Sequence, residues 1–333
     1  MEKHTEYYLK AKKMGKKTIS YSQFNMYSQC PKHWELQYIK KLGKWDPTIF
    51  NVFGTAIHEV IQEFLEVMYG ETAKKAEALP LAQMLKQTMF DLYKKEVEKA
   101  KGEHFSTADD LQDIYYQGVD ILDYLVKNRG KYFSKKNTEL LGIEMPIFME
   151  TETNPNIIVF GFMDVVLKEG DKIRILDLKT STWGWSKAEK KKNGDQLRLY
   201  KRYFSKQYDV PESDINVEYL IVKRKLYENM DFPMKRFQVY EPANGKPSLN
   251  KMSKKLDNFV DSVFNMDGTY KTDAEYPAIT GEKNCNCRWC PFVKDYEGDD
   301  LFPKTKVRGP TNNPFWRMPS RSRCFGQKIC FGV

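Results

Sequence analysis

The sequence has no long hydrophobic run and few cysteines. Its longest apolar stretch, residues 157–167, is about half of the roughly 20 residues that a membrane-spanning helix needs, and it contains Asp164. The Lys-rich N-terminus lacks the apolar segment of a secretory signal. Six cysteines in 333 residues are too few for a disulfide scaffold. We therefore expect a cytoplasmic protein without a membrane partner.

The chain carries an excess of basic residues. Its 54 Lys and Arg residues against 45 Asp and Glu residues give a net charge of +9. Such a balance favours polyanionic partners, first nucleic acid and second an anionic membrane surface. The basic side chains gather in three places: 12–17, 187–192 and 223–225.

Hydrophobic periodicity predicts an α/β protein of about two domains' length. Helical patterns cover 20–39 (interrupted by Pro31), 53–68, 81–100, 111–126, 194–207 and 249–265, and strand patterns cover 139–149, 157–168, 172–179, 217–223 and 236–240. We divide the chain into an N-terminal helical region (1–138), a core (139–266), a cysteine segment (267–293) and a weakly ordered basic tail (294–333).

The strongest local signal is the sequence Asp177-Leu178-Lys179-Thr180 at the end of a predicted strand. Side chains two residues apart on a strand point to the same face, so Asp177 and Lys179 project together. A carboxylate there can hold a hard divalent cation. Asp164 lies within an apolar stretch and must be paired or bind a metal, because burying it alone is costly. The alternative is that both acids lie near turns without a shared role.

Three further residues carry weaker signals. His58 lies on an apolar-striped helix, where a lone histidine is more often structural than a ligand. Gln196 and Tyr200 are four residues apart and share one helix face, which is common by chance.

Together these residues form an ordered set of motifs. Gly54-x-x-x-His58, Gly161-x-x-Asp164, the Asp177–Thr180 segment and Gln196-x-x-x-Tyr200 follow one another over a predicted α-β-β-β-α-β core. This set resembles the PD-(D/E)XK nuclease superfamily, in particular its RecB/AddB-like exonucleases and their relatives in phages and CRISPR adaptation. The similarity extends upstream to Ser20-Tyr21-Ser22-Gln23-Phe24 and Cys30-Pro31, and downstream to Cys287-Arg288-Trp289-Cys290-Pro291-Phe292.

The resemblance implies a restriction-endonuclease-like fold with a mixed central sheet, and it implies roles for individual residues. The catalytic metal, Mg²⁺ or Mn²⁺, would be held by His58, Asp164, Asp177 and the backbone carbonyl of Leu178. Lys179 would orient the attacking water and offset charge on the phosphate. Gln196 and Tyr200 would position the substrate, and Glu144 would add at most a polar contact.

The cysteines match the family less closely. Members with an iron–sulfur cluster take one cysteine from the N-terminal Cys-Pro and three from a C-terminal group, which fits Cys30, Cys287 and Cys290. The fourth ligand would be Cys285, or Cys324 or Cys330 from the tail. A [4Fe–4S] cluster is the favoured interpretation, and four thiolates also suit structural zinc. The remaining interpretation is that no metal binds there.

The resemblance implies a metal-dependent DNA nuclease, most simply an exonuclease acting on single strands or duplex ends in replication, recombination or repair. The alternatives are a non-catalytic nucleic-acid-binding module and a structure-specific endonuclease. The sequence lacks the G-x-x-x-x-G-K-[ST] phosphate loop of helicases, so the chain would rely on a separate helicase or on ends that are already exposed, with a helicase or recombination protein as the expected protein partner.

Overall fold

A computed structural model describes residues 2–43, 46–133, 137–227, 234–279, 287 and 290–292. The chain divides into two compact units, Met1–Asn286 and Cys287–Val333. The first unit contains every helix and strand given below. The predicted basic tail, 294–333, lies outside the described residues.

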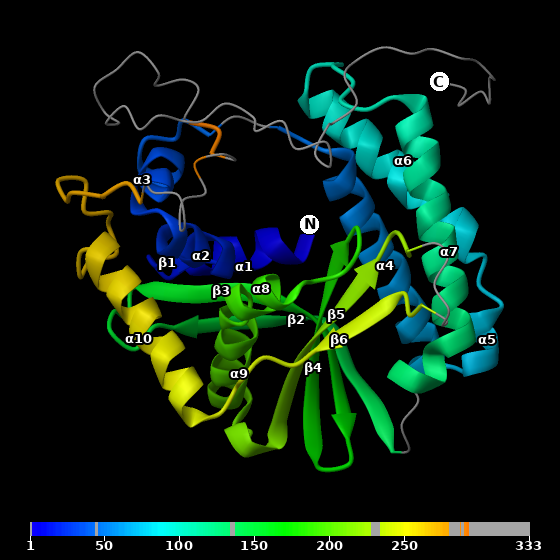
Figure 1. Cartoon of the computed structure of the whole chain (residues 1–333). Helices are drawn as coiled ribbons and strands as arrows, with labels where there is room; N and C mark the ends of the chain where they lie inside the picture. Colours follow the sequence, from blue (N-terminus) through cyan, green and yellow to red (C-terminus); the bar gives the residue numbers. More distant parts are fainter. Residues whose placement is uncertain are drawn as a thin grey trace. The chain divides into compact units, whose positions relative to one another are not determined.

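The centre of the first unit is a mixed sheet (Figure 1). Its strands are β1 (Lys17–Ile19), β2 (Thr138–Glu150), β3 (Ile157–Glu169), β4 (Lys172–Ser181), β5 (Ile215–Lys223) and β6 (Phe237–Tyr240). β3 pairs antiparallel with β2 along nearly its whole length, and its other edge pairs first with β1 and then with β4. β4 and β5 are parallel, and β6 completes the edge antiparallel to β5.

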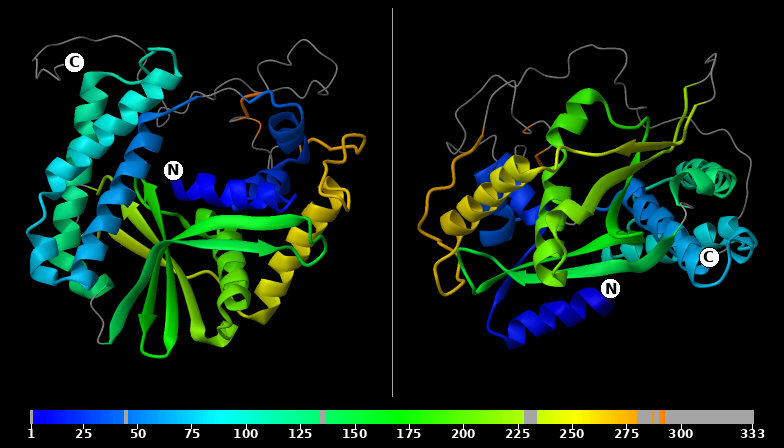
Figure 2. Two further views of the ribbon diagram at one scale, coloured as in Figure 1. Left: turned by 180° about the vertical axis from the view of Figure 1, so that it is seen from behind. Right: turned by 90° about the horizontal axis from the view of Figure 1, so that it is seen from below.

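Helices cover both faces of this sheet. They are α1 (Glu2–Lys13), α2 (Tyr21–Gln29), α3 (Pro31–Trp34), α4 (Ile49–Gly70), α5 (Ala73–Glu77), α6 (Leu81–Lys99), α7 (Ala108–Tyr132), α8 (Lys187–Lys192), α9 (Asp195–Tyr208) and α10 (Lys246–Val263), with a π-helix at Glu35–Ile39 and a 3₁₀ turn at Glu212–Asp214. One apolar core joins α2, α9 and α10 to the sheet, and a second joins α4, α6 and α7 to the opposite face (Figure 2). The α/β fold with a mixed central sheet is therefore confirmed.

Local sequence signals explain where several helices begin. The side chains of Ser20, Thr48 and Thr107 each accept a hydrogen bond from a backbone N–H in the first turn of α2, α4 and α7. Thr107 and Asp110 complete a reciprocal capping box. α2 ends before Pro31, which begins α3, because proline suits a first helical turn and disrupts a helix interior.

The sequence analysis missed α1 and β1, and also the short helices α5 and α8. β1 has only three residues and pairs with β3, about 140 residues further along the chain. α1 has few apolar residues, and it packs on the sheet through Tyr7, whose ring contacts Phe148, Phe160 and Phe162. None of the described helices is both long and apolar enough to cross a membrane.

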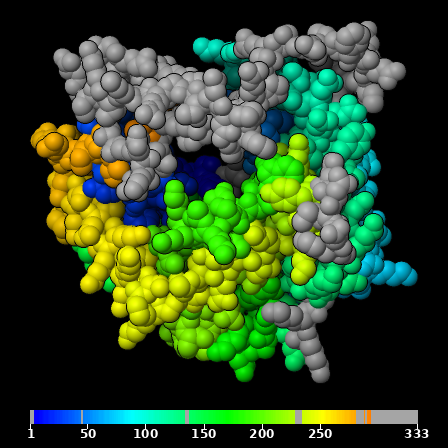
Figure 3. All heavy atoms as spheres, in the orientation of Figure 1, coloured from blue at the N-terminus to red at the C-terminus, as the bar shows by residue number. Residues whose placement is uncertain are grey.

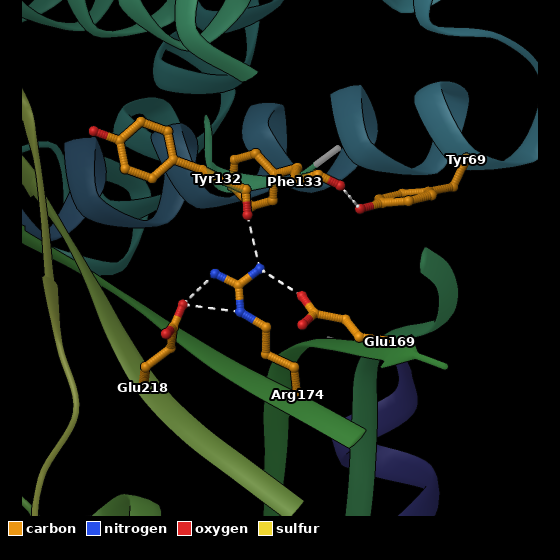
Figure 4. A network of polar contacts seen from close by, with 6 residues as sticks. All are labelled: Tyr69, Tyr132, Phe133, Glu169, Arg174 and Glu218. Atoms are coloured by element: carbon orange, nitrogen blue, oxygen red, sulfur yellow. Dashed lines mark hydrogen bonds and ion pairs between the residues drawn. The ribbon is translucent and has the colours of Figure 1, made fainter. Parts of the chain in front are cut away.

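A buried arginine links the sheet to the C-terminal end of α7 (Figure 4). Arg174 on β4 is only 6% exposed. Its Nη1 donates to the backbone oxygen of Tyr132 at 2.7 Å and to Glu169 at 3.1 Å, and its Nε donates to Glu218 at 3.0 Å. The guanidinium thereby pairs with two half-buried carboxylates and donates to one of the last carbonyls of α7, which have no acceptor role within the helix.

We expect Arg174→Ala to lower the free energy of unfolding by about 3–5 kcal/mol, because it leaves Glu169 and Glu218 without the cation that they share. Chemical denaturation measures this loss. Lys172→Ala, on the same strand, is the matched control. Lys172 forms an exposed ion pair with Asp214, so its removal should cost no more than about 1 kcal/mol. Equal losses in the two variants would contradict the role given to Arg174.

Candidate active site

The site lies where β3 and β4 separate. The last backbone pair between them joins Val165 to Leu176, and the next two residues, Asp164 on β3 and Asp177 on β4, are no longer paired. Beyond this point the Asp164 side chain replaces a ladder hydrogen bond, because its Oδ2 accepts from the backbone N–H of Leu178 at 2.7 Å. A carboxylate is thus fixed in the opening between two strands that remain paired below it.

Asp177 and Lys179 extend from the same face of β4, as the alternation of a strand requires. Lys179 Nζ lies 2.5 Å from Asp177 Oδ2, and Asp177 is 1% exposed. Within the described part of the chain, neither Asp177 oxygen has a hydrogen bond of regular geometry, and its close polar contact is the ion pair with Lys179. Asp177 is therefore a desolvated carboxylate with acceptor capacity left over for a cation.

Helix α4 supplies the third group of the site. His58 Nδ1 lies 3.9 Å from Asp164 Oδ2. One turn later, Gln62 donates to Glu144 Oε1 at 2.9 Å and to the backbone oxygen of Asp164 at 3.2 Å. Gln62 was missed by the sequence analysis, although its position four residues after His58, on the same helix face, was an available signal.

Glu144 has an unusual backbone conformation. Its neighbours on β2 pair with the neighbours of Asp164 on β3, so the two acids lie opposite each other. Its φ is +51°, in the left-handed region that residues other than glycine rarely adopt and that costs roughly 1–3 kcal/mol. The Gln62 side chain holds the Glu144 carboxylate in this position, beside Asp164.

A cavity of about 270 Å³ opens next to these residues, and Asp164, Glu144, Gln196 and Tyr200 line it. Ser20, Tyr21 and Ser22 from the start of α2 also line it, as does His4 on α1. In Figure 3 a hollow opens above the green atoms of α8, and the dark blue of the N-terminal segment is visible within it. The structure thus brings Asp164, Gln196 and Tyr200 together around one cavity. His58, Asp177 and Lys179 are not among its lining residues and join it through Asp164.

Gln196 and Tyr200 on α9, which the sequence analysis predicts to position the substrate, form one hydrogen-bonded unit. Gln196 Nε2 donates to the Tyr200 hydroxyl at 2.9 Å. Burial and the nearby Asp177 carboxylate keep the pKa of Tyr200 well above its usual value. Tyr200 therefore stays protonated and can donate its own proton to an oxygen atom in the cavity.

Burial controls the charge states of the other residues. It raises the pKa of Asp164 and of Asp177 to about 6, although Lys179 acts in the opposite direction. Burial and Lys179 together lower the pKa of His58 to about 4. Burial also lowers the pKa of Lys179, but the two carboxylates outweigh it and raise that pKa above its usual value. At neutral pH the site therefore has a neutral imidazole, two carboxylates and one ammonium.

This donor set suits a hard divalent cation. Carboxylate oxygens favour Mg²⁺, and an added imidazole favours Mn²⁺. Among the described residues, no three His, Cys, Asp or Glu side chains are already grouped as a metal site. The Lys179 ammonium is paired with Asp177, and the Leu178 N–H is bonded to Asp164, so a cation would have to displace or share these contacts.

The predicted cysteine centre is described only in part. Cys285, Cys324 and Cys330 lie outside the described residues. Cys30, between α2 and α3, is a half-buried free thiol in the first unit. Cys287 and Cys290 belong to the second unit, and Cys287 is disulfide-bonded. A cluster would need Cys287 as a thiolate, so the centre stays a prediction.

Comparison with known families agrees with this arrangement. Residues 18–294 match the family model described as the PD-(D/E)XK nuclease superfamily. The chain belongs to this superfamily. The match begins after α1 and so leaves out His4, but it includes β2 to β6 and the residues His58, Asp164, Asp177, Lys179, Gln196 and Tyr200. Nucleases of this superfamily generally use divalent metals, in agreement with the donor set.

Two solved structures are similar to the chain. One is the crystal structure of a "putative exonuclease" from Eubacterium rectale, with 11% sequence identity and a TM-score of 0.46. The similar region covers 84% of this chain and 91% of that protein's chain. The other is the crystal structure of a protein called SSO0001, with 10% sequence identity and a TM-score of 0.35. The similar region covers 88% of this chain and 95% of that protein's chain. No curated protein matches the sequence.

We expect 2 mM MnCl₂ to raise the melting temperature by several degrees at pH 7.5 and by much less at pH 5. The raised pKa values mean that these two carboxyls contribute less to the stability of the metal-free fold as the pH rises from about 4 to about 6, where they become ionised in the folded state. A bound cation offsets this loss, but only where the carboxyls are ionised. Thermal unfolding with and without EDTA measures both effects.

Asp177→Asn should remove the manganese-dependent shift at pH 7.5. Asp214→Asn is the matched control, since Asp214 is paired with Lys172 on the surface and should leave the shift intact. An equal shift at both pH values, or one that persists in Asp177→Asn, would contradict this assignment.

Proposed function

We propose that this protein is a divalent-metal-dependent DNA nuclease of the RecB/AddB-like branch, acting as an exonuclease on single strands or duplex ends. The observation that carries the proposal is the contact set at the break in the sheet. There Asp164 is fixed by the Leu178 N–H, and the buried Asp177 is paired with Lys179. The superfamily membership makes phosphodiester hydrolysis the reaction that such a set would perform.

Each residue has a distinct proposed part in this reaction. His58, Asp164, Asp177 and the Leu178 carbonyl would hold the cation, which supplies positive charge to the phosphate and acidifies a water molecule. Lys179 would orient that water and stabilise the charge that develops on the phosphate. The Tyr200 hydroxyl, held by Gln196, would donate to a phosphate oxygen in the cavity.

The assignment to DNA and to strand ends depends on sequence as well as geometry. The net charge of +9 favours a polyanion. The full motif series, from His58 through Tyr200, is the one that resembles the exonuclease branch. Because the sequence has no helicase phosphate loop, the protein would act on ends that are already exposed or that a separate helicase or recombination protein supplies.

We expect Lys179→Ala to lower the rate of hydrolysis of end-labelled linear single-stranded DNA by at least about 100-fold with Mg²⁺ or Mn²⁺, because charge stabilisation at the phosphate is lost. Lys168→Ala is the matched control. Lys168 is an exposed lysine near the other end of β3, so this variant should keep wild-type activity. Circular dichroism checks that both variants fold.

The same assay with covalently closed circles tests for exonuclease action. An exonuclease leaves circles intact under conditions that degrade linear DNA. Efficient nicking of circles would instead support a structure-specific endonuclease. Binding without hydrolysis in the wild type, with both metals, would support a non-catalytic module.

We also propose that Cys30 and the C-terminal cysteines, including Cys287 and Cys290, hold a [4Fe–4S] cluster with a structural role. The half-buried free thiol of Cys30 at the junction of α2 and α3 suits a thiolate ligand. Such a cluster would join the start of the chain to its C-terminal segment.

We expect the protein prepared without oxygen to be brown, with about four irons per chain, and Cys30→Ser to lose both colour and iron. Cys290→Ser should behave alike. The Cys285→Ser variant identifies the fourth ligand. Loss of iron would assign that role to Cys285, and retention of iron would assign it to Cys324 or Cys330. One zinc per chain, or no metal from an iron-replete preparation, would reject the cluster.

A further inference from the structure

Three large aromatic side chains lie exposed near the C-terminal ends of β4 and β5. Phe50, Trp183 and Tyr227 are 55%, 44% and 56% exposed. The rings of Trp183 and Tyr227 are stacked, with centroids 4.8 Å apart and planes at 15°. The Arg224 guanidinium lies 4.5 Å from the centroid of the Phe50 ring. We call this surface the aromatic–basic patch; it consists of Phe50, Trp183, Lys223, Arg224, Lys225 and Tyr227.

Backbone hydrogen bonds hold the patch in place. Beyond the ends of β4 and β5, the N–H groups of Arg224 and Lys225 donate to the carbonyls of Ser181 and Thr182, each at 2.9 Å. Arg224 Nη2 also donates to the Thr182 hydroxyl at 2.5 Å. The Ser181 side chain closes the turn that carries Trp183 by bonding to Gly184. The rings are therefore pre-organised, which reduces the entropy lost when a ligand binds.

Two elements connect the patch to the candidate active site. Trp183 follows Lys179 by four residues, so their Cα atoms are at most about 14 Å apart. Phe50 is the second residue of α4, and His58 lies about two turns later, about 12 Å along the helix axis. The ends of these elements meet at Gly54 and Thr180, where a Cβ on Gly54 would lie 3.5 Å from the Thr180 hydroxyl. The patch is thus next to the site, on elements that carry its chemical groups.

The composition of the patch indicates which ligand it fits. Ring faces bind other flat rings by stacking, and the neighbouring Lys223, Arg224 and Lys225 can pair with phosphates. A single strand offers unstacked bases and phosphates together, whereas a duplex hides its base faces within the stack. Three exposed aromatic rings do little for stability, so their grouping with cations favours a binding role.

We propose that the aromatic–basic patch binds single-stranded DNA and guides it to the active site, with bases stacking on Trp183 and Tyr227. The proposal rests on the proposed nuclease function only for the identity of the substrate. It adds a preference for single strands, which the chemical groups of the site do not themselves provide.

The test is binding of a fluorescein-labelled 15-nucleotide single strand, measured by anisotropy in EDTA so that no metal-dependent hydrolysis occurs. We expect Trp183→Ala to weaken binding by about 5- to 100-fold, the range for loss of one stacked base. Tyr227→Ala should weaken it similarly. Lys225→Ala should lower the slope of log affinity against log salt by about one.

Phe90→Ala is the matched control, because Phe90 is an aromatic residue of similar exposure, 45%, on α6. It should bind like the wild type. Unchanged single-strand affinity in both Trp183→Ala and Tyr227→Ala would overturn the proposal. An equal loss of affinity for a blunt duplex would overturn the preference for single strands.

The two proposals can fail separately. Normal strand binding with a fully active Lys179→Ala variant would reject the nuclease site and leave the patch in place. Loss of hydrolysis in Lys179→Ala, with strand affinity unchanged in the Trp183→Ala and Tyr227→Ala variants, would reject the patch and retain the nuclease.

Discussion

The Asp164 carboxylate accepts the Leu178 N–H at the point where β3 and β4 stop pairing, and the other groups of the site are placed relative to this contact. Below it, β3 and β4 form an ordinary antiparallel ladder. Above it, β3 turns toward β1 and β4 continues beside β5. The opening admits side chains where a continuous sheet would have only backbone. A carboxylate can maintain it because its oxygen satisfies the N–H that the separation leaves unpaired.

Placing two acids in this opening is unfavourable for the fold. Their raised pKa values show that the apolar surroundings disfavour their charged forms, and one lysine only partly compensates. At the opposite end of β4 the charges are well compensated, because Arg174 pairs with the carboxylates of Glu169 and Glu218 and donates to a backbone carbonyl. The extensive apolar cores on both faces of the sheet supply the stability that offsets the burial of these two acids. Of the two ends of β4, the one with poorly compensated charge is thus the end where a cation would supply the missing positive charge and a phosphate would bind.

The order of helices and strands could be predicted because it depends on local patterns. β3 reads as a continuous apolar run since it is covered on both faces, and α4 and α10 carry clear apolar stripes. β1 could not be predicted, because three residues carry no periodicity and its partner is distant in the sequence. The shared face of Asp177 and Lys179 follows from alternation alone. The left-handed backbone at Glu144 and its bond to Gln62 do not, because both depend on which strand and helix lie opposite.

Chemistry and substrate choice have different structural requirements in this molecule. A group that works by electrostatics acts most strongly where water is excluded, and in the proposed mechanism the almost fully buried Asp177 beside Lys179 meets this condition. A group that selects a substrate must instead be reachable before the substrate enters the site. In the proposed role, Trp183 and Tyr227 would meet this need, since they follow the ends of β4 and β5, just beyond the last paired residues. β4 carries Lys179, and Trp183 follows two residues after the strand ends. The same stretch of backbone therefore positions the proposed catalytic lysine and one of the rings that would select the substrate.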